Sequence, residues 1–358
     1  MKNLLMKKCL IVIAAAAMLA GCAKNEVTTP VVNTPAEITF TTAPLTKALA
    51  AGQSSFSTSN IFRTCAYYTP ADFDYTASGE VFFDWQTVSH NKTNDNWKTA
   101  TSYFWPKDGG KLSFFSWSLN TASLKYADGT TDPAVTFDPT SGITLSNYAS
   151  GNDFMVADPA LNKIGNFLTY QYLGVPTLFR HKAAQINFKV KTKKAYTGRT
   201  FTLNSISFVN VSTTGTYVQG NNLTGTGAVA ESWTAKASDA TTVYWSDASV
   251  TEALTFADTE VAVTANGTSI FVPQEFTDAD DTKVLEIKYS ITTGSSTVQK
   301  TAKVKMNTIL GGSATQGTAF QMGKIYTITL IFSGSEILWN PEVVDWETMG
   351  KDVTVTNE

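Results

Sequence analysis

The residues that could carry metal or acid–base chemistry are few and lie far apart. The chain of 358 residues has two histidines, His90 and His181. Neither belongs to an HExxH motif, an HxH motif or a Cys/His cluster with zinc-ligand spacing. The segment TDADD at 277–281 offers carboxylates for calcium, but it has neither the glycine nor the distal glutamate of an EF-hand loop. We therefore predict no metal site and no cofactor, with 277–281 forming a solvated turn.

Carboxylate pairs and a nucleophilic thiol are two other kinds of catalytic group. Glycoside hydrolysis needs two opposed carboxylates, and a pair such as Asp84 and Asp153 would serve, although nothing marks these residues above the other acids. Cys65 has no histidine motif around it and is expected to be a small buried hydrophobe on a strand. The sequence contains neither a G-x-S-x-G elbow nor a GxxxxGK[ST] loop. The prediction is a protein that is not an enzyme.

Cys22 invites a different chemistry, the attachment of lipid. It follows a basic start, an apolar run at 10–18 and the small or apolar residues at 19–21. The apolar run is too short to cross a bilayer, which needs about 20 residues, and is typical of a secretory signal. Small residues before a cysteine match the bacterial lipobox, in which the cysteine is acylated and becomes the new N-terminus. We predict a lipoprotein signal peptide at 1–21, although an ordinary signal with an incidental cysteine is the alternative.

The remaining bulk properties limit the class of protein. Residues 22–35 carry two prolines among polar side chains, which is typical of a linker, here attached to lipid. The net charge of −3, without a basic stripe, makes nucleic acid an improbable partner. Charged residues form only 16% of the chain, and Thr, Val and aromatic residues are abundant. This composition favours strands over helices.

Alternating polarity predicts strands with one buried face. In QINFKVK, Ile186, Phe188 and Val190 point one way, and VLEIKYSIT at 284–292 and TAKVKMN at 301–307 show the same period of two. KIYTITLIF at 324–332 is apolar on both faces and suits a central strand. Turn-rich spacers separate these segments, so the fold class is predicted to be all-β, built from antiparallel β-sandwiches.

The length predicts two sandwiches in tandem. The first is assigned to 36–176 and the second, including the C-terminal tail, to 177–358. The segment LFRHKAAQINFKVKT at 178–192 can close the first sandwich or open the second.

The aromatic groups FFDW, YFWP and SFFSW permit two interpretations. Exposed Trp and Tyr rings could stack on sugars, which would make the protein a surface glycan-binding lipoprotein. Their position on strands favours a role in filling the sandwich core.

Several patterns follow one another along the chain. They are the lipobox at Cys22, a short ITFTT strand before a basic residue, W…T…YFWP…GGKLSFFSWS from Trp97 to Ser118, DFMVADP at 153–159, FRHKAAQINFKV at 179–190 and GKIYTITLIF…ILWNPEVVDW at 323–346. Together these patterns resemble the fimbrillin family, the subunits of Bacteroidetes type V pili.

The resemblance implies two transthyretin-like β-sandwich domains, exported as a lipoprotein to the outer membrane and displayed at the cell surface in a fimbrium that contributes to cell adhesion. It further implies a processing protease that cuts after the first strand. Donor-strand exchange follows, in which the C-terminal strand of another pilus subunit fills the exposed groove. The physical logic is independent of the family, because an incoming strand satisfies free backbone groups and buries alternate side chains.

On this chain the removable first strand is expected at 38–42, with Ile38 and Phe40 as its buried residues. Cleavage would follow Lys47, although the family's typical site is an arginine and a solvated loop residue is an equal alternative. The tail alternates Val353 and Val355 with threonines and is the candidate donor strand, or else a strand of its own domain. Stalk, tip and anchor roles all remain open for such a subunit.

Overall fold

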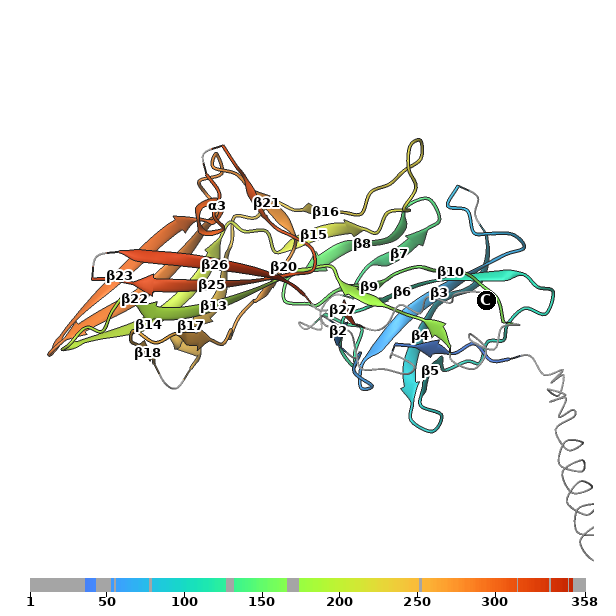
Figure 1. Ribbon diagram of the computed structural model, residues 1–358, viewed down its shortest axis with the longest axis horizontal. Coiled ribbons are helices and arrows are strands. Elements are labelled where there is room, and N and C mark those ends of the chain that lie inside the picture. Colours follow the sequence, from blue (N-terminus) through green and yellow to red (C-terminus); the bar gives the residue numbers. More distant parts are fainter. Residues whose placement is uncertain are drawn as a thin grey trace, which may run out of the picture. The chain divides into compact units, whose positions relative to one another are not determined.

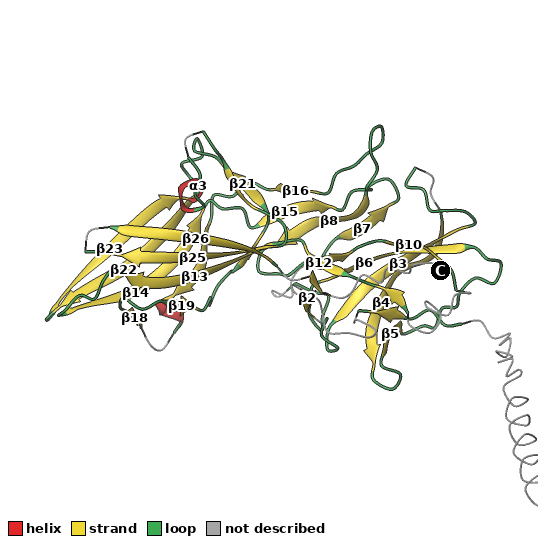
Figure 2. Cartoon of the chain, viewed as in Figure 1, coloured by secondary structure: helices red, strands yellow, loops and turns green. Residues whose placement is uncertain are grey.

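The strands of this protein form because β-branched and aromatic residues alternate with polar ones between frequent turns. The computed structural model describes residues 36–42, 53–54, 56–76, 79–126, 132–165, 174–250, 253–313, 315–334, 336–346 and 348–349. Nearly all the regular structure in these ranges is strand (Figures 1 and 2). The helical elements there are the 3-10 turn η1 at Asp247–Ser249 and the short helix α3 at Met306–Ile309. The predicted all-β class is confirmed, and no helix in the described ranges is long and apolar enough to cross a membrane.

The largest sheet contains most strands of the first half of the chain. Its order is β11-β1-β5-β4-β3-β6-β9-β12-β27-β2, and β10 pairs with β6 outside this path. Its strands are β1 Phe40–Thr41, β2 Gln53–Ser54, β3 Ile61–Thr69, β4 Glu80–Asn91, β5 Asn96–Thr99, β6 Lys111–Ser118, β9 Met155–Ala157, β10 Ala160–Lys163, β11 Val175–Pro176, β12 Phe179–His181 and β27 Thr348–Met349.

This sheet curls on itself around an aromatic cluster. Phe40 lies near one end of the strand order and Phe179 near the other. The rings of both contact Phe62 of the central strand β3, at centroid distances of 5.7 and 5.3 Å. Because these side chains meet on one side of the sheet, its two ends must bend toward each other.

A second, four-stranded sheet covers the other side of the large sheet. Its order is β16-β15-β8-β7, and its strands are β7 Val135–Asp138, β8 Gly142–Ala149, β15 Thr214–Val218 and β16 Ser232–Ala235. Buried side chains from both sheets form a common core, including Phe115, Tyr148 and Tyr217. The layers therefore pack as a β-sandwich.

Two further sheets enclose a separate core of buried residues. One has the order β19-β13-β25-β26 with β20 beside β13, and the other has the order β17-β14-β22-β23 with β18 beside β14. Their strands are β13 Ala184–Thr192, β14 Arg199–Val209, β17 Thr241–Ser246, β18 Leu254–Phe256, β19 Val261–Val263, β20 Ile270–Phe271, β22 Val284–Thr293, β23 Ser296–Lys305, β25 Lys324–Phe332 and β26 Ile337–Asp345. A small two-stranded antiparallel sheet of β21 Gln274–Phe276 and β24 Thr318–Phe320 completes the strands.

The predicted alternation is confirmed in β13, where Ile186, Phe188 and Val190 are each 1% exposed or less. The predicted central strand, β25, has a neighbour on each side. The prediction of purely antiparallel sheets is wrong at three pairs, because β13 runs parallel to β25, β1 to β11 and β2 to β27. Alternating burial reports that one face is covered, but it carries no information about the direction of the neighbouring strand.

Strand pairing links segments far apart in the sequence. β15 follows β14 closely in sequence, yet it pairs with β8 of the first sandwich. β27, near the end of the chain, pairs with β12 and β2. The boundary between 36–176 and 177–358 stays a prediction, and strands from beyond residue 177 contribute to the first sandwich. The described residues from Glu37 onward form one compact unit.

Candidate functional site

The expected first strand lies inside the large sheet, between two neighbours. Phe40 of β1 pairs with Val175 of β11 in parallel and with Trp97 of β5 in antiparallel register. The backbone N–H of Val175 donates to the Thr39 carbonyl at 2.7 Å. On the other side, the Ile38 N–H donates to the Tyr103 carbonyl at 2.8 Å. The segment is therefore hydrogen-bonded along both edges.

The side chains of this strand are buried more fully than its length would suggest. Ile38 and Phe40 are each 1% exposed. The ring of Phe40 meets Phe62 and Phe114 edge to face, at centroid distances of 5.7 and 5.6 Å. Burial of two such side chains contributes about 1.5–3 kcal/mol each relative to exposure. β1 is thus held in place chiefly by apolar side chains in a groove of the sheet.

A polar contact secures the start of the strand. The Glu37 carboxylate accepts a hydrogen bond from the Ser102 hydroxyl at 2.6 Å and lies 3.3 Å from the Lys98 ammonium. Both charged side chains are about one-third exposed, so the pair contributes at most about 1 kcal/mol. This contact sets the register of residues 37–40 more than it stabilises the fold.

Gly174 permits the close approach of β11 to β1. Its φ of +82° lies in the left-handed region that glycine adopts without strain. A Cβ atom at this position would lie 2.7 Å from the Phe40 carbonyl carbon. The backbone of β1 therefore lies where a side chain on residue 174 would have to be.

The other residues predicted to act in processing and assembly lie outside the described residues. These are Cys22, Lys47, Val353 and Val355. The described chain ends at β27, whose residue Met349 pairs with Phe179 of β12. The C-terminal segment thus reaches the large sheet that also contains β1.

A buried polar network at β12 could not be predicted from the sequence. Nδ1 of His181 lies 2.7 Å from Oδ1 of Asp153, and the histidine side chain is 1% exposed. The amide of Asn120 donates to Oδ2 of Asp153 at 3.0 Å, and the Asn60 amide donates to the Asn120 carbonyl oxygen at 2.8 Å. The ring of Trp346 stacks on His181. The carboxylate of Asp153 therefore has a structural role, because it binds the buried ring of His181.

The other titratable candidates also have structural surroundings. Cys65 is 1% exposed, as predicted for a buried hydrophobe. Burial raises the pKa of its thiol well above the ordinary value, and the negative charge of Asp84 adds to the rise. His90 lies in β4, where its side chain is 9% exposed and its Nε2 lies 3.0 Å from Oδ1 of Asp95. Within the described ranges, no three His, Cys, Asp or Glu residues form a group that could hold a metal ion.

Most of the strand aromatics fill the cores. Trp97, Trp105 and Trp117 are each 4% exposed, and Phe114 and Phe115 are 2% exposed or less. Trp85 remains half-buried at the rim of the first core. The core-filling interpretation therefore holds for most of these residues, and Trp85 is an exception.

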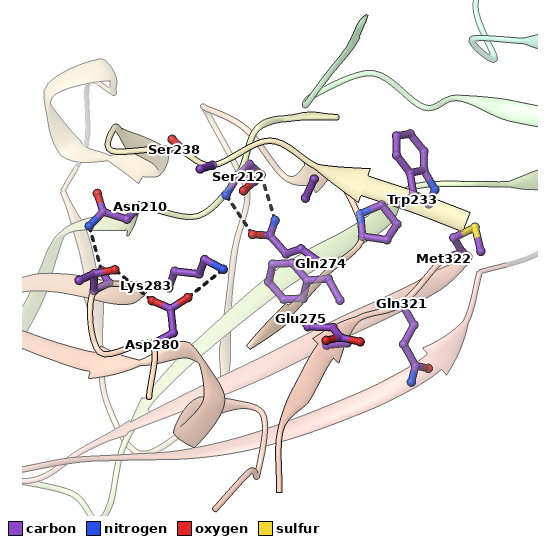
Figure 3. Close-up of a pocket in the computed structure, with 16 residues that line it drawn as sticks. Asn210, Ser212, Trp233, Ser238, Gln274, Glu275, Asp280, Lys283, Gln321 and Met322 are labelled. Carbon is purple, nitrogen blue, oxygen red and sulfur yellow. Dashed lines mark hydrogen bonds and ion pairs between the residues drawn. The ribbon is translucent and has the colours of Figure 1, made fainter. Parts of the chain in front are cut away.

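A pocket of about 810 Å³ lies beside β16 and the two-stranded sheet of β21 and β24 (Figure 3). Several of its polar groups are bonded to one another or to the neighbouring backbone. The Gln274 amide exchanges hydrogen bonds with the Ser212 backbone, and Asp280 pairs with Lys283 at 2.8 Å. The Trp233 indole N–H donates to the Lys182 carbonyl at 2.7 Å. These contacts indicate a structural role for the polar side chains that line this pocket.

Comparison with known proteins identifies the protein family, which the fold alone does not identify. The sequence profile of the Fimbrillin-like family matches residues 34–346, so the chain belongs to this family, and the resemblance seen in the sequence is confirmed. The comparison with curated proteins gives no match.

Solved structures give the same class of fold. A fimbrial protein from Bacteroides vulgatus ATCC 8482 is 18% identical with a TM-score of 0.51, covering 80% of this chain and 92% of that chain. The tip fimbrial protein Mfa3 from Porphyromonas gingivalis, with a C-terminal truncation, is 9% identical with a TM-score of 0.37, covering 87% and 98%. The first of these similarities supports the shared fold.

Proposed function

We propose that this protein is a structural, non-enzymatic subunit of a type V-like pilus, assembled by donor-strand exchange and contributing to cell adhesion. Its family and its fimbrial structural neighbour support a pilus subunit role at the cell surface. In this proposal Cys22 carries the lipid that holds the precursor to the outer membrane. The two cores correspond to tandem transthyretin-like domains, predicted at 36–176 and 177–358, with β12, β15 and β16 from beyond residue 177 completing the first sandwich.

The observation that carries the proposal is that a very short first strand fills a groove of the large sheet with buried side chains. Ile38 and Phe40 are almost wholly buried, while β1 itself spans two residues. Removal of residues 37–42 would leave an apolar groove between β5 and β11 with free backbone groups on both edges. A strand from a second subunit could satisfy those groups and place its own apolar side chains in the groove.

The remaining parts of the mechanism follow from this groove. A protease cutting after Lys47 would separate the lipid and the first strand from the rest of the chain. Val353 and Val355 of another subunit would then enter in place of Ile38 and Phe40. Because the groove and the tail are different surfaces of one subunit, the contact is head-to-tail and extends into a filament.

Brief trypsin treatment of the purified precursor tests the proposal, with mass spectrometry to locate the cut and electron microscopy to detect polymers. We expect cleavage after Lys47, loss of residues 37–42 from the folded body, and filaments. Lys47→Gln should block both steps, whereas Lys92→Gln, which changes an exposed lysine in the turn after β4, should block neither.

A second variant separates cleavage from assembly. Replacement of Val353 and Val355 by Asp should leave cleavage intact and abolish polymers, because carboxylates cannot enter an apolar groove without a large desolvation cost. Cleaved protein that stays monomeric with its native tail would contradict donor-strand exchange.

A further inference from the structure

A second pocket, of about 420 Å³, lies on the face of the large sheet opposite to the one on which Phe40 meets Phe62. It is lined by residues of β3, β4 and β6 and by the segments 122–125 and 132–135. The volume falls within the range of about 300–1,000 Å³ that is usual for small-ligand sites. Among the described residues, neither β1 nor β26 lines this pocket, so the pocket is separate from the groove of the first strand.

One row of side chains across the sheet forms part of the pocket wall. Arg63 of β3 pairs with Thr87 of β4 on one side and with Trp117 of β6 on the other. Directly opposed residues of neighbouring strands point to the same face, so these three side chains stand side by side. All three line the pocket.

Two tryptophans give the pocket an aromatic wall. Trp85 is half-buried and packs against the rim of the first core. Trp117 is 4% exposed, and its buried indole N–H has no hydrogen-bond partner among the described residues. Trp85 is therefore the more accessible of the two rings.

The charges around the pocket favour an anion. Arg63 is exposed and forms no ion pair within the described part of the chain. The other cation, Lys125, lies 3.9 Å from the carboxylate of Asp132, and both of these side chains are exposed. The lining therefore carries two positive charges and one negative charge, and the guanidinium of Arg63 remains free to bind a carboxylate in a bidentate manner.

We propose that this pocket binds a saccharide that carries a carboxylate. Arg63 pairs with the carboxylate, and the face of Trp85 packs against the apolar C–H face of the sugar ring. The hydroxyl groups of Thr87 and Ser123, which also line the pocket, supply hydrogen bonds to the sugar hydroxyls. This chemistry is shared by sialic acids and uronic acids.

Isothermal titration calorimetry of the purified protein tests the proposal and separates the two sources. The probes are N-acetylneuraminic acid and glucuronic acid, with galactose and N-acetylglucosamine as neutral controls. We expect at least one acidic sugar to bind at least tenfold more tightly than either neutral sugar. The acidic sugar with the higher affinity then shows whether the ligand is a sialic acid or a uronic acid. Absence of binding by both acids, or equal binding of a neutral sugar, overturns the proposal.

Two variants that alter the charge of the pocket should change the affinity for the acidic sugar in opposite directions. A defect in folding could only lower this affinity. Arg63→Gln should weaken binding of the acidic sugar about ten- to a hundredfold, because a charge-assisted hydrogen-bond pair is lost. Asp132→Asn should strengthen it about two- to fivefold, because the carboxylate that repels the ligand is removed. The matched control Arg199→Gln, an exposed arginine at the start of β14, should leave affinity unchanged.

Trp85→Ala should abolish binding while near-ultraviolet circular dichroism confirms that the fold is kept. Wild-type affinity in Arg63→Gln or in a folded Trp85→Ala protein overturns the assignment of the site.

Discussion

The imidazole ring of His181 and the indole ring of Trp346 stack with centroids 4.0 Å apart and an interplanar angle of 7°. His181 belongs to β12, and Trp346 lies between β26 and β27. The backbone N–H of Trp346 also donates to the backbone carbonyl of Gly323 at 2.7 Å. The contact fixes the C-terminal segment against the large sheet immediately before β27.

Trp346→Ala should release this attachment. Loss of the stack and of the accompanying burial should lower the free energy of unfolding by about 1–2 kcal/mol. Hydrogen exchange should become faster for the amides of 337–346 than for those of β13, which do not depend on the contact. Trp346→Phe keeps an aromatic ring on His181 and should show less than half the effect, and an equal effect of the two variants would contradict a role for stacking.

Asp153→Ala should destabilise the protein by about 2–4 kcal/mol. Nε2 of His181 already has no partner in the described structure, so loss of Asp153 leaves a buried ring with neither nitrogen bonded. Asp132→Ala changes an exposed aspartate and should stay within about 0.5 kcal/mol of the wild type by chemical denaturation. Similar losses in the two variants would show that the Asp153 network contributes little.

Burial within each strand could be predicted from the sequence because it depends on local pattern. Ile186, Phe188 and Val190 alternate with polar residues, and hydrophobicity alone decides which of them enter the core. The apolar run of β25 likewise indicated a strand with neighbours on both sides. These features are properties of single segments.

Pairing between distant segments could not be predicted in the same way. Nothing in TGTYV identifies β8 as the neighbour of β15, because that choice depends on the whole packed chain. The same holds for the stack of His181 with Trp346, which lie 165 positions apart in the sequence. The burial of Ile38 and Phe40 was accessible from their alternation, but the parallel pairing of β1 with β11 was not.

Glu286→Gln should reduce stability in a manner that depends on pH. A hydrogen bond from Lys303, aided by Lys288, lowers the pKa of the Glu286 carboxyl below its ordinary value of 4.5. A group with a lowered pKa in the folded state stabilises the protein above the unfolded pKa and loses this effect as the pH falls through the folded pKa.

The Glu286→Gln variant should therefore be less stable than the wild type by about 0.5–1 kcal/mol at pH 7, with the difference vanishing at strongly acidic pH. Urea denaturation across this range provides the measurement. Glu275→Gln, on the exposed side of β21, is the matched control and should give a difference that is small at every pH. A constant deficit in Glu286→Gln would point to packing instead of charge.

Cys65 should resist alkylation in the folded protein. Its thiol is 1% exposed and its pKa is raised by burial and by the charge of Asp84, so the reactive thiolate is scarce at pH 8. Iodoacetamide labelling followed by mass spectrometry of the peptide that contains Cys65 should show modification only after denaturant is added. Rapid labelling under native conditions would mean that β3 opens readily.

Gly174→Ala should weaken the docking of β1 specifically. Alanine at a φ of +82° carries a conformational cost of about 1 kcal/mol, and its Cβ would also lie 2.7 Å from the Phe40 backbone. Gly151→Ala is the matched control, because Gly151 has a φ of +91° and no atom within 4 Å of the added Cβ. In the control, the free energy of unfolding should fall only by the conformational cost. In Gly174→Ala it should fall further, and residues 37–42 should become accessible to proteases.

The comparison of these two variants isolates the contact between β11 and β1. Limited proteolysis with peptide mapping should release 37–42 earlier in Gly174→Ala than in Gly151→Ala, while the core strand β13 stays protected in both. If assembly proceeds by replacement of the first strand, Gly174→Ala should also obstruct the incoming strand, because its backbone must follow the path of Phe40. Equal proteolysis of the two variants would mean that β11 moves freely away from β1 and that Gly174 does not define the groove.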